Sequence, residues 1–144
     1  MKIIIRECLL DDYKELYIIN KEEMGYTYPK ELMKEKLKKI LKQNTDKIFV
    51  AVIENKVVGY VHANDYDVMY MDHMKNIMGI AVSSSYKHLG IGRKLLTKIE
   101  EWARNDGASK VRLVSGETRV GAHEFYKRCG YVNDKKQLYF IKKL

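Results

Sequence analysis

One segment of the chain carries more structural information than any other, and it reads Ile80-Ala81-Val82-Ser83-Ser84-Ser85-Tyr86-Lys87-His88-Leu89-Gly90-Ile91-Gly92-Arg93-Lys94-Leu95-Leu96. Its apolar start is typical of a buried strand, and the three serines end that strand. The apolar spacing that follows predicts a helix over 90–105. Free N–H groups and the positive end of the helix dipole converge at such a helix start. Gly90 and Gly92 have no side chain to keep a phosphate group from the backbone, so we expect an anion site here.

Two common phosphate-binding motifs are excluded by the residues at this turn. A dinucleotide-binding fingerprint that begins at Gly90 requires a third glycine at position 95, where the chain has Leu95. A P-loop requires Gly-Lys-Ser/Thr, but Gly92 is followed by Arg93-Lys94. A plain turn between a strand and a helix remains the alternative interpretation.

The patterns on both sides of this segment predict an α+β fold with a single domain over residues 1–144. Apolar runs predict strands at 3–6, 48–53, 57–63, 77–82, 110–114, 131–132 and 138–141. Helical spacing predicts a first helix that contains 16–19 and further helices at 30–43, 90–105 and 120–129. The strand at 77–82, the helix at 90–105 and the strand at 110–114 form a β-α-β unit. We expect its two strands to be parallel.

Composition and charge limit the class of protein and of ligand. The chain has 144 residues, 46% of them hydrophobic, and a formal net charge of +8, which suits an anionic ligand, an acidic partner or a nucleic acid. Its two cysteines, Cys8 and Cys129, form neither a disulfide framework nor a metal pattern, and the four histidines lack paired spacing. We therefore expect a reduced, cytoplasmic protein with no metal. No apolar run approaches the roughly 18 residues of a membrane span, so we expect no membrane partner.

Two motifs resemble those of the GNAT superfamily of N-acetyltransferases. Lys87-His88-Leu89-Gly90-Ile91-Gly92 is similar to the family's Gln/Arg-x-x-Gly-x-Gly/Ala signature, which also follows a strand and opens a helix. Ala122-His123-Glu124-Phe125-Tyr126-Lys127-Arg128-Cys129-Gly130-Tyr131 resembles the segment Ala-x-x-Phe-Tyr-x-x-x-Gly-Phe. The resemblance implies the GNAT fold. This fold has a mixed, mostly antiparallel sheet of six to seven strands with a central splayed parallel pair, flanked by about four helices.

The resemblance also implies an activity, namely transfer of an acetyl group from acetyl-CoA, as cosubstrate, to a primary amine by direct attack in a ternary complex. The cofactor-binding residues that it implies are Ile80, Ala81, Val82, Lys87, His88, Leu89, Gly90, Ile91, Gly92, Arg93, Arg119 and Tyr126. Among them the strand residues would pair with the pantetheine arm, the loop would hold the pyrophosphate, and an N–H near Val82 would stabilise the oxyanion. Lys87 stands where Gln or Arg is usual, and it keeps the charge without the bidentate fork. Arg119 stands where Asn is often found.

The resemblance assigns a catalytic role to Tyr126, whereas Glu117 is our own candidate for the general base. Tyr126 matches the tyrosine that protonates the departing thiolate. A phenol with a reference pKa near 10 is protonated at neutral pH and can donate to a thiolate, whose thiol has a pKa of about 8.5. A packing role is the alternative for this side chain. The identity of the general base is open. Many relatives carry a glutamate on the strand that precedes the phosphate loop, but the strand around 76–80 here has no carboxylate. The candidates are therefore Glu117, Asp72 and His73.

The acceptor amine is open as well. We expect residues 20–35 and 64–75 to wall its site, because loops over a scaffold usually set specificity. These segments are acidic and aromatic, which suits a cationic amine, and contain Glu22, Glu23, Asp65, Asp67, Asp72, Tyr26, Tyr28, Tyr66 and Tyr70. A small polyamine, an aminoglycoside-like amine and a protein N-terminus or lysine all remain candidates. A homodimer would be common for the family.

Two other function classes compete with the enzyme. A catalytically inactive CoA-binding sensor on the same fold would explain the missing strand carboxylate. A nucleic-acid-binding module would explain the net charge of +8 and the 11 tyrosines. The second is disfavoured because the positive charges are dispersed and no nucleic-acid-binding motif is present.

Overall fold

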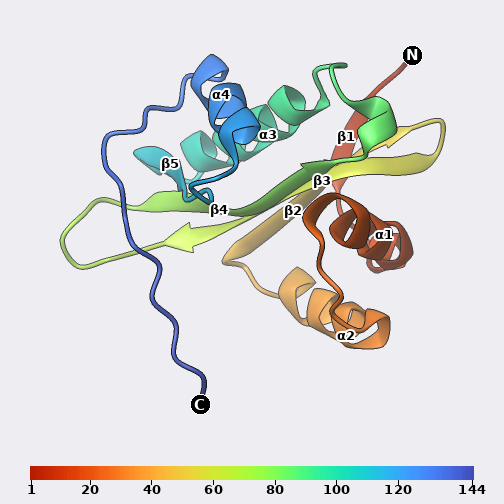
Figure 1. Ribbon diagram of the computed structural model, residues 1–144, viewed down its shortest axis with the longest axis horizontal. Coiled ribbons are helices and arrows are strands. Elements are labelled where there is room, and N and C mark those ends of the chain that lie inside the picture. Colours follow the sequence, from red (N-terminus) through yellow and green to blue (C-terminus); the bar gives the residue numbers. More distant parts are fainter. The chain divides into compact units, whose positions relative to one another are not determined.

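A five-stranded sheet organises residues Met1–Leu113, the first of two compact units (Figure 1). The strands follow one another across the sheet in sequence order, and only the last pair, β4 and β5, is parallel. The strands are β1 (Ile4–Glu7), β2 (Asp46–Ile53), β3 (Lys56–Tyr66), β4 (Met74–Val82) and β5 (Lys110–Leu113). The computed structural model describes residues 1–144. Val114–Leu144 form the second unit and are described separately.

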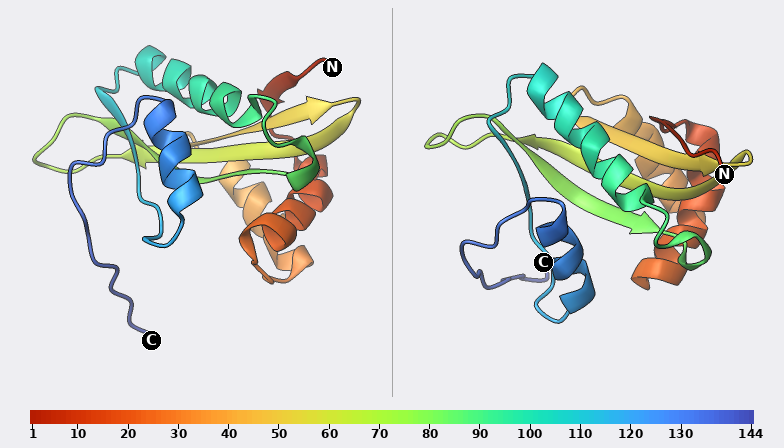
Figure 2. Two further views of the ribbon diagram at one scale, coloured as in Figure 1. Left: turned by 45° about the horizontal axis from the view of Figure 1, so that its top comes forward. Right: turned by 90° about the horizontal axis from the view of Figure 1, so that it is seen from above.

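Helices cover both faces of this sheet (Figure 2). On one face lie α1 (Tyr13–Met24) and α2 (Lys30–Leu41), and on the other lies α3 (Ile91–Asn105). Two short 3-10 helices, η1 (Leu10–Asp12) and η2 (Ser84–Tyr86), precede α1 and α3. None of the helices is long and apolar enough to cross a membrane.

Alternating apolar side chains build a core on each side of the sheet. Towards α1 and α2, the buried strand residues Ile48, Val50, Val52, Val57 and Ala81 pack with Leu16, Ile19 and Leu37. The buried face of α3 consists of Ile91, Leu95, Leu96, Ile99 and Ala103. Their spacing of three and four residues places them on one stripe of the helix, as the sequence predicts.

A β-bulge lies where β4 separates from β5. Between β3 and β4 the register shifts after the His62–Gly79 pair to the Ala63–Ile77 pair, so Met78 is the extra residue. Parallel pairing of β4 with β5 ends at Ile77, although β4 continues to Val82. A bulge increases the local twist and interrupts pairing. This geometry confirms the predicted β-α-β unit and its splayed parallel pair.

The connection between β3 and β4 is shorter than the predicted segment 64–75. Strand β3 continues through Tyr66 and β4 begins at Met74, which leaves only 67–73 between them. Polar side chains at the ends of both strands interrupt the apolar pattern from which strands are predicted, so the predicted strands are too short. Several of these side chains are paired with each other, as described below.

The second unit, Val114–Leu144, contains one helix and no strand. Helix α4 covers Val120–Arg128, close to the predicted 120–129. The strands predicted at 131–132 and 138–141 are wrong, and the sheet has five strands instead of six to seven. Leu138, Tyr139, Phe140 and Ile141 favour extended backbone by composition, but each is at least 79% exposed. A strand also requires a neighbour that completes its hydrogen-bond ladder, and these residues have none within the chain. The single-domain organisation stays a prediction.

Candidate active site

The loop between β4 and α3 has a fixed backbone shape. The N–H of Ser83 donates to the Val58 carbonyl at 2.8 Å, and the N–H of Tyr86 donates to the Ser83 carbonyl at 2.9 Å. His88 and Gly90 follow with φ values of 66° and 81°, in the left-handed region. Glycine adopts this region freely, whereas for histidine it is uncommon and costs conformational energy. The loop therefore holds a strained residue at the predicted anion site.

The start of α3 presents backbone donors without a capping side chain. Gly90 is the N-cap residue, and its carbonyl accepts the N–H of Lys94 at 3.1 Å, which begins the helix ladder. No side chain caps this end, and a carbon atom added at Gly90 would meet nothing within 4 Å. The N–H groups of Ile91 and Gly92 have no acceptor within the helix, because the first turn never does. This end can receive an anion.

Basic side chains surround the same loop. Lys87, Arg93 and Lys94 are exposed. Lys87 Nζ lies 3.6 Å from Glu23 Oε1, beyond a normal hydrogen bond. The structure thus brings the predicted residues Lys87–Arg93 into one loop and helix turn, directly after Ile80–Val82.

Strand β4 offers a free backbone edge beside this loop. From Gly79 to Val82 the strand pairs only with β3 within this unit, because pairing with β5 has ended at Ile77. Every second residue of this stretch directs its N–H and C=O groups away from β3. An extended ligand that carries amide groups can complete such an edge as an added strand.

The second unit carries the remaining predicted site residues. Tyr126 lies on α4, is partly buried, and its ring contacts Phe125 and Tyr131 at centroid distances of 5.4 and 6.2 Å. Burial raises the pKa of Tyr126 from its usual 10, so the phenol is protonated at neutral pH. Glu117 is exposed, and Arg119 is exposed at the N-cap of α4. Their predicted grouping with the loop of the first unit stays a prediction.

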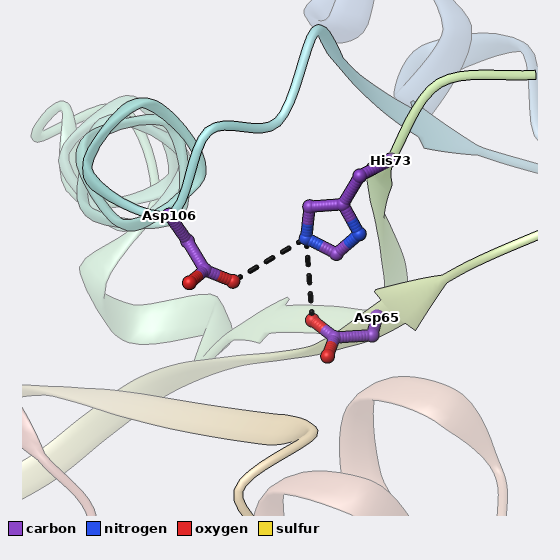
Figure 3. Close-up of side chains that lie close together, drawn as sticks. All are labelled: Asp65, His73 and Asp106. Carbon is purple, nitrogen blue, oxygen red and sulfur yellow. Dashed lines mark hydrogen bonds and ion pairs between the residues drawn. The ribbon is translucent and has the colours of Figure 1, made fainter.

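Most of the acidic residues predicted for the acceptor wall are engaged by other partners, and Figure 3 shows one of them, Asp65, beside His73 and Asp106. The Lys75 side chain is fully buried, and its Nζ donates to Asp65 Oδ1 at 2.5 Å and to Asp106 Oδ2. It also lies 3.8 Å from the centre of the Trp102 ring. His73 lies among the same carboxylates, with Nε2 3.3 Å from Asp106 Oδ2 and 3.8 Å from Asp65 Oδ1.

The Lys75 ammonium supplies the positive charge of this cluster. Asp65, His73 and Asp106 could hold a metal ion by the spacing of their ligand atoms, but the ammonium already bridges both aspartates. A hydrogen bond with Asp67 at 2.7 Å is the main cause of the raised pKa of His73. This candidate base is therefore held in an ion-pair network. Asp72, the other candidate in this segment, is exposed.

A small cavity of about 150 Å³ lies between α1, α2 and strands β2 and β3. Its walls are mostly apolar, and its polar lining consists of Asn20, Tyr28, Lys36, Tyr60 and His62. His62 is the cross-strand partner of Gly79, which belongs to the free stretch of β4. The cavity therefore borders β3, which is the strand next to the free edge of β4.

Sequence reasoning placed Glu23 only in the acceptor wall and missed its contacts. Its carboxylate accepts the N–H of Ser84 at 3.0 Å and lies 2.8 and 2.9 Å from the Ser84 hydroxyl. The two residues are 61 positions apart, so no local pattern could indicate the pair. His62 Nε2, 2.7 Å from Asp46 Oδ2, is a second pair that the sequence did not reveal.

Comparison with known proteins gives one family. The model of the acetyltransferase (GNAT) family matches residues 13–131. An uncharacterised N-acetyltransferase of Methanocaldococcus jannaschii is 32% identical over 128 residues, which are 85% of this chain and 56% of that protein. The chain thus spans little more than half the length of this relative.

Solved structures share the fold. A transcriptional regulator from Bacillus halodurans C-125 has a TM-score of 0.88 and 21% identity, covering 98% of this chain and 100% of that one. The aminoglycoside N-acetyltransferase AAC(6')-Iy, solved with the bisubstrate analog CoA-S-monomethyl-acetylneamine, has a TM-score of 0.88 and 16% identity over the full length of both chains. At such identities these neighbours show the fold alone. The family match, in contrast, spans most of the sequence and includes both motifs, and the chain belongs to the acetyltransferase (GNAT) family.

Proposed function

We propose that this protein transfers an acetyl group from acetyl-CoA to a primary amine by direct attack in a ternary complex. The observation that carries the proposal is the junction of β4 and α3, where a free strand edge leads directly into an uncapped, basic helix start. Coenzyme A has the matching chemistry, with an amide-containing arm joined to a pyrophosphate. The fold neighbour AAC(6')-Iy was solved with a CoA conjugate, which agrees with this assignment.

The cofactor contacts follow from that junction. The backbone at Ile80, Ala81 and Val82 pairs with the amides of the arm, and the N–H groups of 87–93 receive the pyrophosphate. Lys87 and Arg93 add positive charge. From the second unit, Arg119 and Tyr126 complete the contacts to the arm in this proposal.

Bound acetyl-CoA supplies an activated thioester, and attack by the amine nitrogen forms the C–N bond and breaks the C–S bond. A backbone N–H near Val82 stabilises the charge that develops on the carbonyl oxygen. Tyr126 gives its phenolic proton to the departing sulfur. Its raised pKa keeps that proton in place at neutral pH. Glu117, directly or through water, removes the proton from the amine.

The acceptor in this proposal is a small molecule or peptide with a primary amine, and it approaches from the face covered by α1 and α2. The cavity beside His62 lies on this face, and Tyr28 from the predicted wall lines it. Because Asp65 and Asp67 are engaged by Lys75 and His73, the exposed Glu22 and Asp72 are the carboxylates left to attract a cationic amine. An aminoglycoside amine is one candidate, since the bisubstrate analog of AAC(6')-Iy contains one.

Acetyl transfer to a panel of amines tests the function. The panel contains polyamines, aminoglycosides and peptides with a free N-terminus or lysine, and release of the CoA thiol is followed. We expect turnover by the parent protein and a loss of at least about 100-fold in kcat for Tyr126→Phe, with acetyl-CoA binding retained, as for loss of a general acid. Tyr139→Phe, which removes the hydroxyl of an exposed tyrosine in the same unit, is the matched control.

The outcomes separate the competing functions. Acetyl-CoA binding without turnover on any amine would favour the sensor, and steep salt-dependent binding to DNA or RNA would favour the nucleic-acid module. If Tyr126→Phe retains full turnover, this tyrosine is not the acid. The pH profiles of kcat/KM for the parent and for Glu117→Gln test the general base. If the acidic limb of the profile is the same in both proteins, Glu117 is not the base.

A further inference from the structure

The side chain of Glu23 is directed from α1 into the loop that precedes α3. Glu23 is the second-last residue of α1, and its side chain is only 11% exposed. Both carboxylate oxygens lie within hydrogen-bond distance of the Ser84 hydroxyl, and one accepts the Ser84 N–H at 3.0 Å. The carboxylate therefore binds the first residue of η2 at two points.

This contact replaces a cap that the loop itself does not provide. Ser83 is the N-cap residue of η2, but its side chain makes no capping hydrogen bond. An acceptor for the first N–H groups of a helix stabilises its start. Here the acceptor comes from another element, and the loop that it holds continues to the strained His88 and to Gly90.

Glu23 also balances charge at the loop. Burial alone would raise the pKa of Glu23, but the hydrogen bonds from Ser84 and the nearby charge of Lys87 outweigh it and lower the pKa. The carboxylate is therefore ionised at neutral pH. The 3.6 Å separation leaves Lys87 close to Glu23 without a short hydrogen bond, so its ammonium can turn towards another anion.

We infer that Glu23 is a positioning residue that holds the β4–α3 loop in its phosphate-binding shape through Ser84. This inference rests on the proposed function, because the phosphate is that of acetyl-CoA. Glu23 precedes the segment that connects α1 to α2, so the helix that covers the acceptor face also orders the cofactor loop. Its two contacts have opposite effects on the cofactor. The Ser84 bonds preorganise the loop, which favours binding, whereas the negative charge beside Lys87 opposes it.

These opposite effects make the amide variant informative. Glu23→Gln keeps a carbonyl oxygen that can accept from Ser84, but it removes the charge beside Lys87. Glu23→Ala removes both the acceptor and the charge. The first variant therefore retains the loop shape and frees Lys87, whereas the second loses the shape.

The experiment measures CoA binding by calorimetry, together with the KM values for acetyl-CoA and for the amine. We expect Glu23→Ala to weaken CoA binding and to raise the KM for acetyl-CoA by about 10-fold, as for loss of preorganisation. The kcat and the KM for the amine should change less than about 2-fold. Glu23→Gln should bind CoA as tightly as the parent or tighter. The control variant Glu101→Ala, which removes one exposed carboxylate from α3, should match the parent.

Several results would overturn the inference. CoA binding by Glu23→Ala equal to that of the parent would exclude the role, as would a Gln variant as weak as the Ala variant. If Glu23→Ala does not fold, Glu23→Asp replaces it, because its shorter side chain withdraws the carboxylate from both contacts with Ser84. An unchanged affinity in that variant would overturn the inference. If the parent does not bind CoA, the proposed function itself is overturned. If the parent and all variants bind CoA equally well, only the inference about Glu23 is overturned.

Discussion

Replacement of Lys75 by methionine should lower the free energy of unfolding by about 3 kcal/mol, because it removes a buried cation and leaves its carboxylates facing each other. The charged hydrogen bond to Asp65 contributes about 2 kcal/mol. The desolvated contact with Trp102 contributes about 1 kcal/mol. The bond to the more exposed Asp106 is screened by water and is left out of the value.

The assay is thermal unfolding followed by circular dichroism. For a chain of this size, 3 kcal/mol corresponds to a decrease in melting temperature of about 6 to 12 °C. Lys110→Met on the adjacent strand β5 is the matched control, since Lys110 is exposed and should tolerate the change. A decrease below about 1 kcal/mol for Lys75→Met would refute the reasoning. It would show that Lys75 is no more than a tolerated buried charge.

Two further predictions concern titration and thiol reactivity. The hydrogen bond with Asp67 raises the pKa of His73 above 6.5, so protonated His73 stabilises the folded protein. This stabilisation is fully present below about pH 6.5 and is lost as the pH rises through the pKa that His73 has in the folded protein. The melting temperature should decrease over that range, and His73→Gln should remove this dependence; an unchanged slope would contradict the assignment. Burial raises the pKa of Cys8 to about 12, so at pH 8 this thiol should react with a thiol reagent far more slowly than the less buried Cys129. Mass spectrometry of the labelled peptides measures both rates, and equal rates would contradict the burial of Cys8.

The central β-α-β unit could be predicted from sequence because its signals are local. The apolar run ending at Val82, the glycines at 90 and 92 and the stripe from Ile91 to Ala103 each lie within a few residues of one another. The same periodicity placed α2 and α4 within two residues of their ends. Local patterns sufficed wherever an element is specified by its own side chains.

The prediction of two C-terminal strands is wrong for the opposite reason, because these elements depend on a partner elsewhere in the chain. Leu138 to Ile141 have the composition of a strand, but a strand exists only when a neighbouring strand completes its hydrogen bonds. A sequence pattern indicates that residues favour extended backbone, but it does not indicate whether a neighbouring strand is present to pair with them. The prediction therefore assigned two elements that the chain does not form.

The polar contacts of the site were beyond local reasoning in the same way. Glu23 meets Ser84 across 61 positions, and Lys75 meets Asp106 across 31. A lysine is expected at the surface by its charge alone. Only the fold reveals that two aspartates and Trp102 compensate for the burial of Lys75. The position of the loop in the sequence could be predicted, whereas the side chains that hold it could not.

Binding of acetyl-CoA by the parent protein and by Gly92→Glu, measured by calorimetry, tests the central claim most directly. Gly92 lies in the first turn of α3, where a glutamate favours the helix dipole and should leave the fold intact. Its carboxylate would repel the pyrophosphate from the same N–H groups. We predict binding of one acetyl-CoA per chain by the parent and at least a 100-fold loss in the variant, about 2.7 kcal/mol, with an unchanged melting temperature. Absence of binding by the parent, or equal binding by both proteins, would contradict the claim that this loop holds the cofactor.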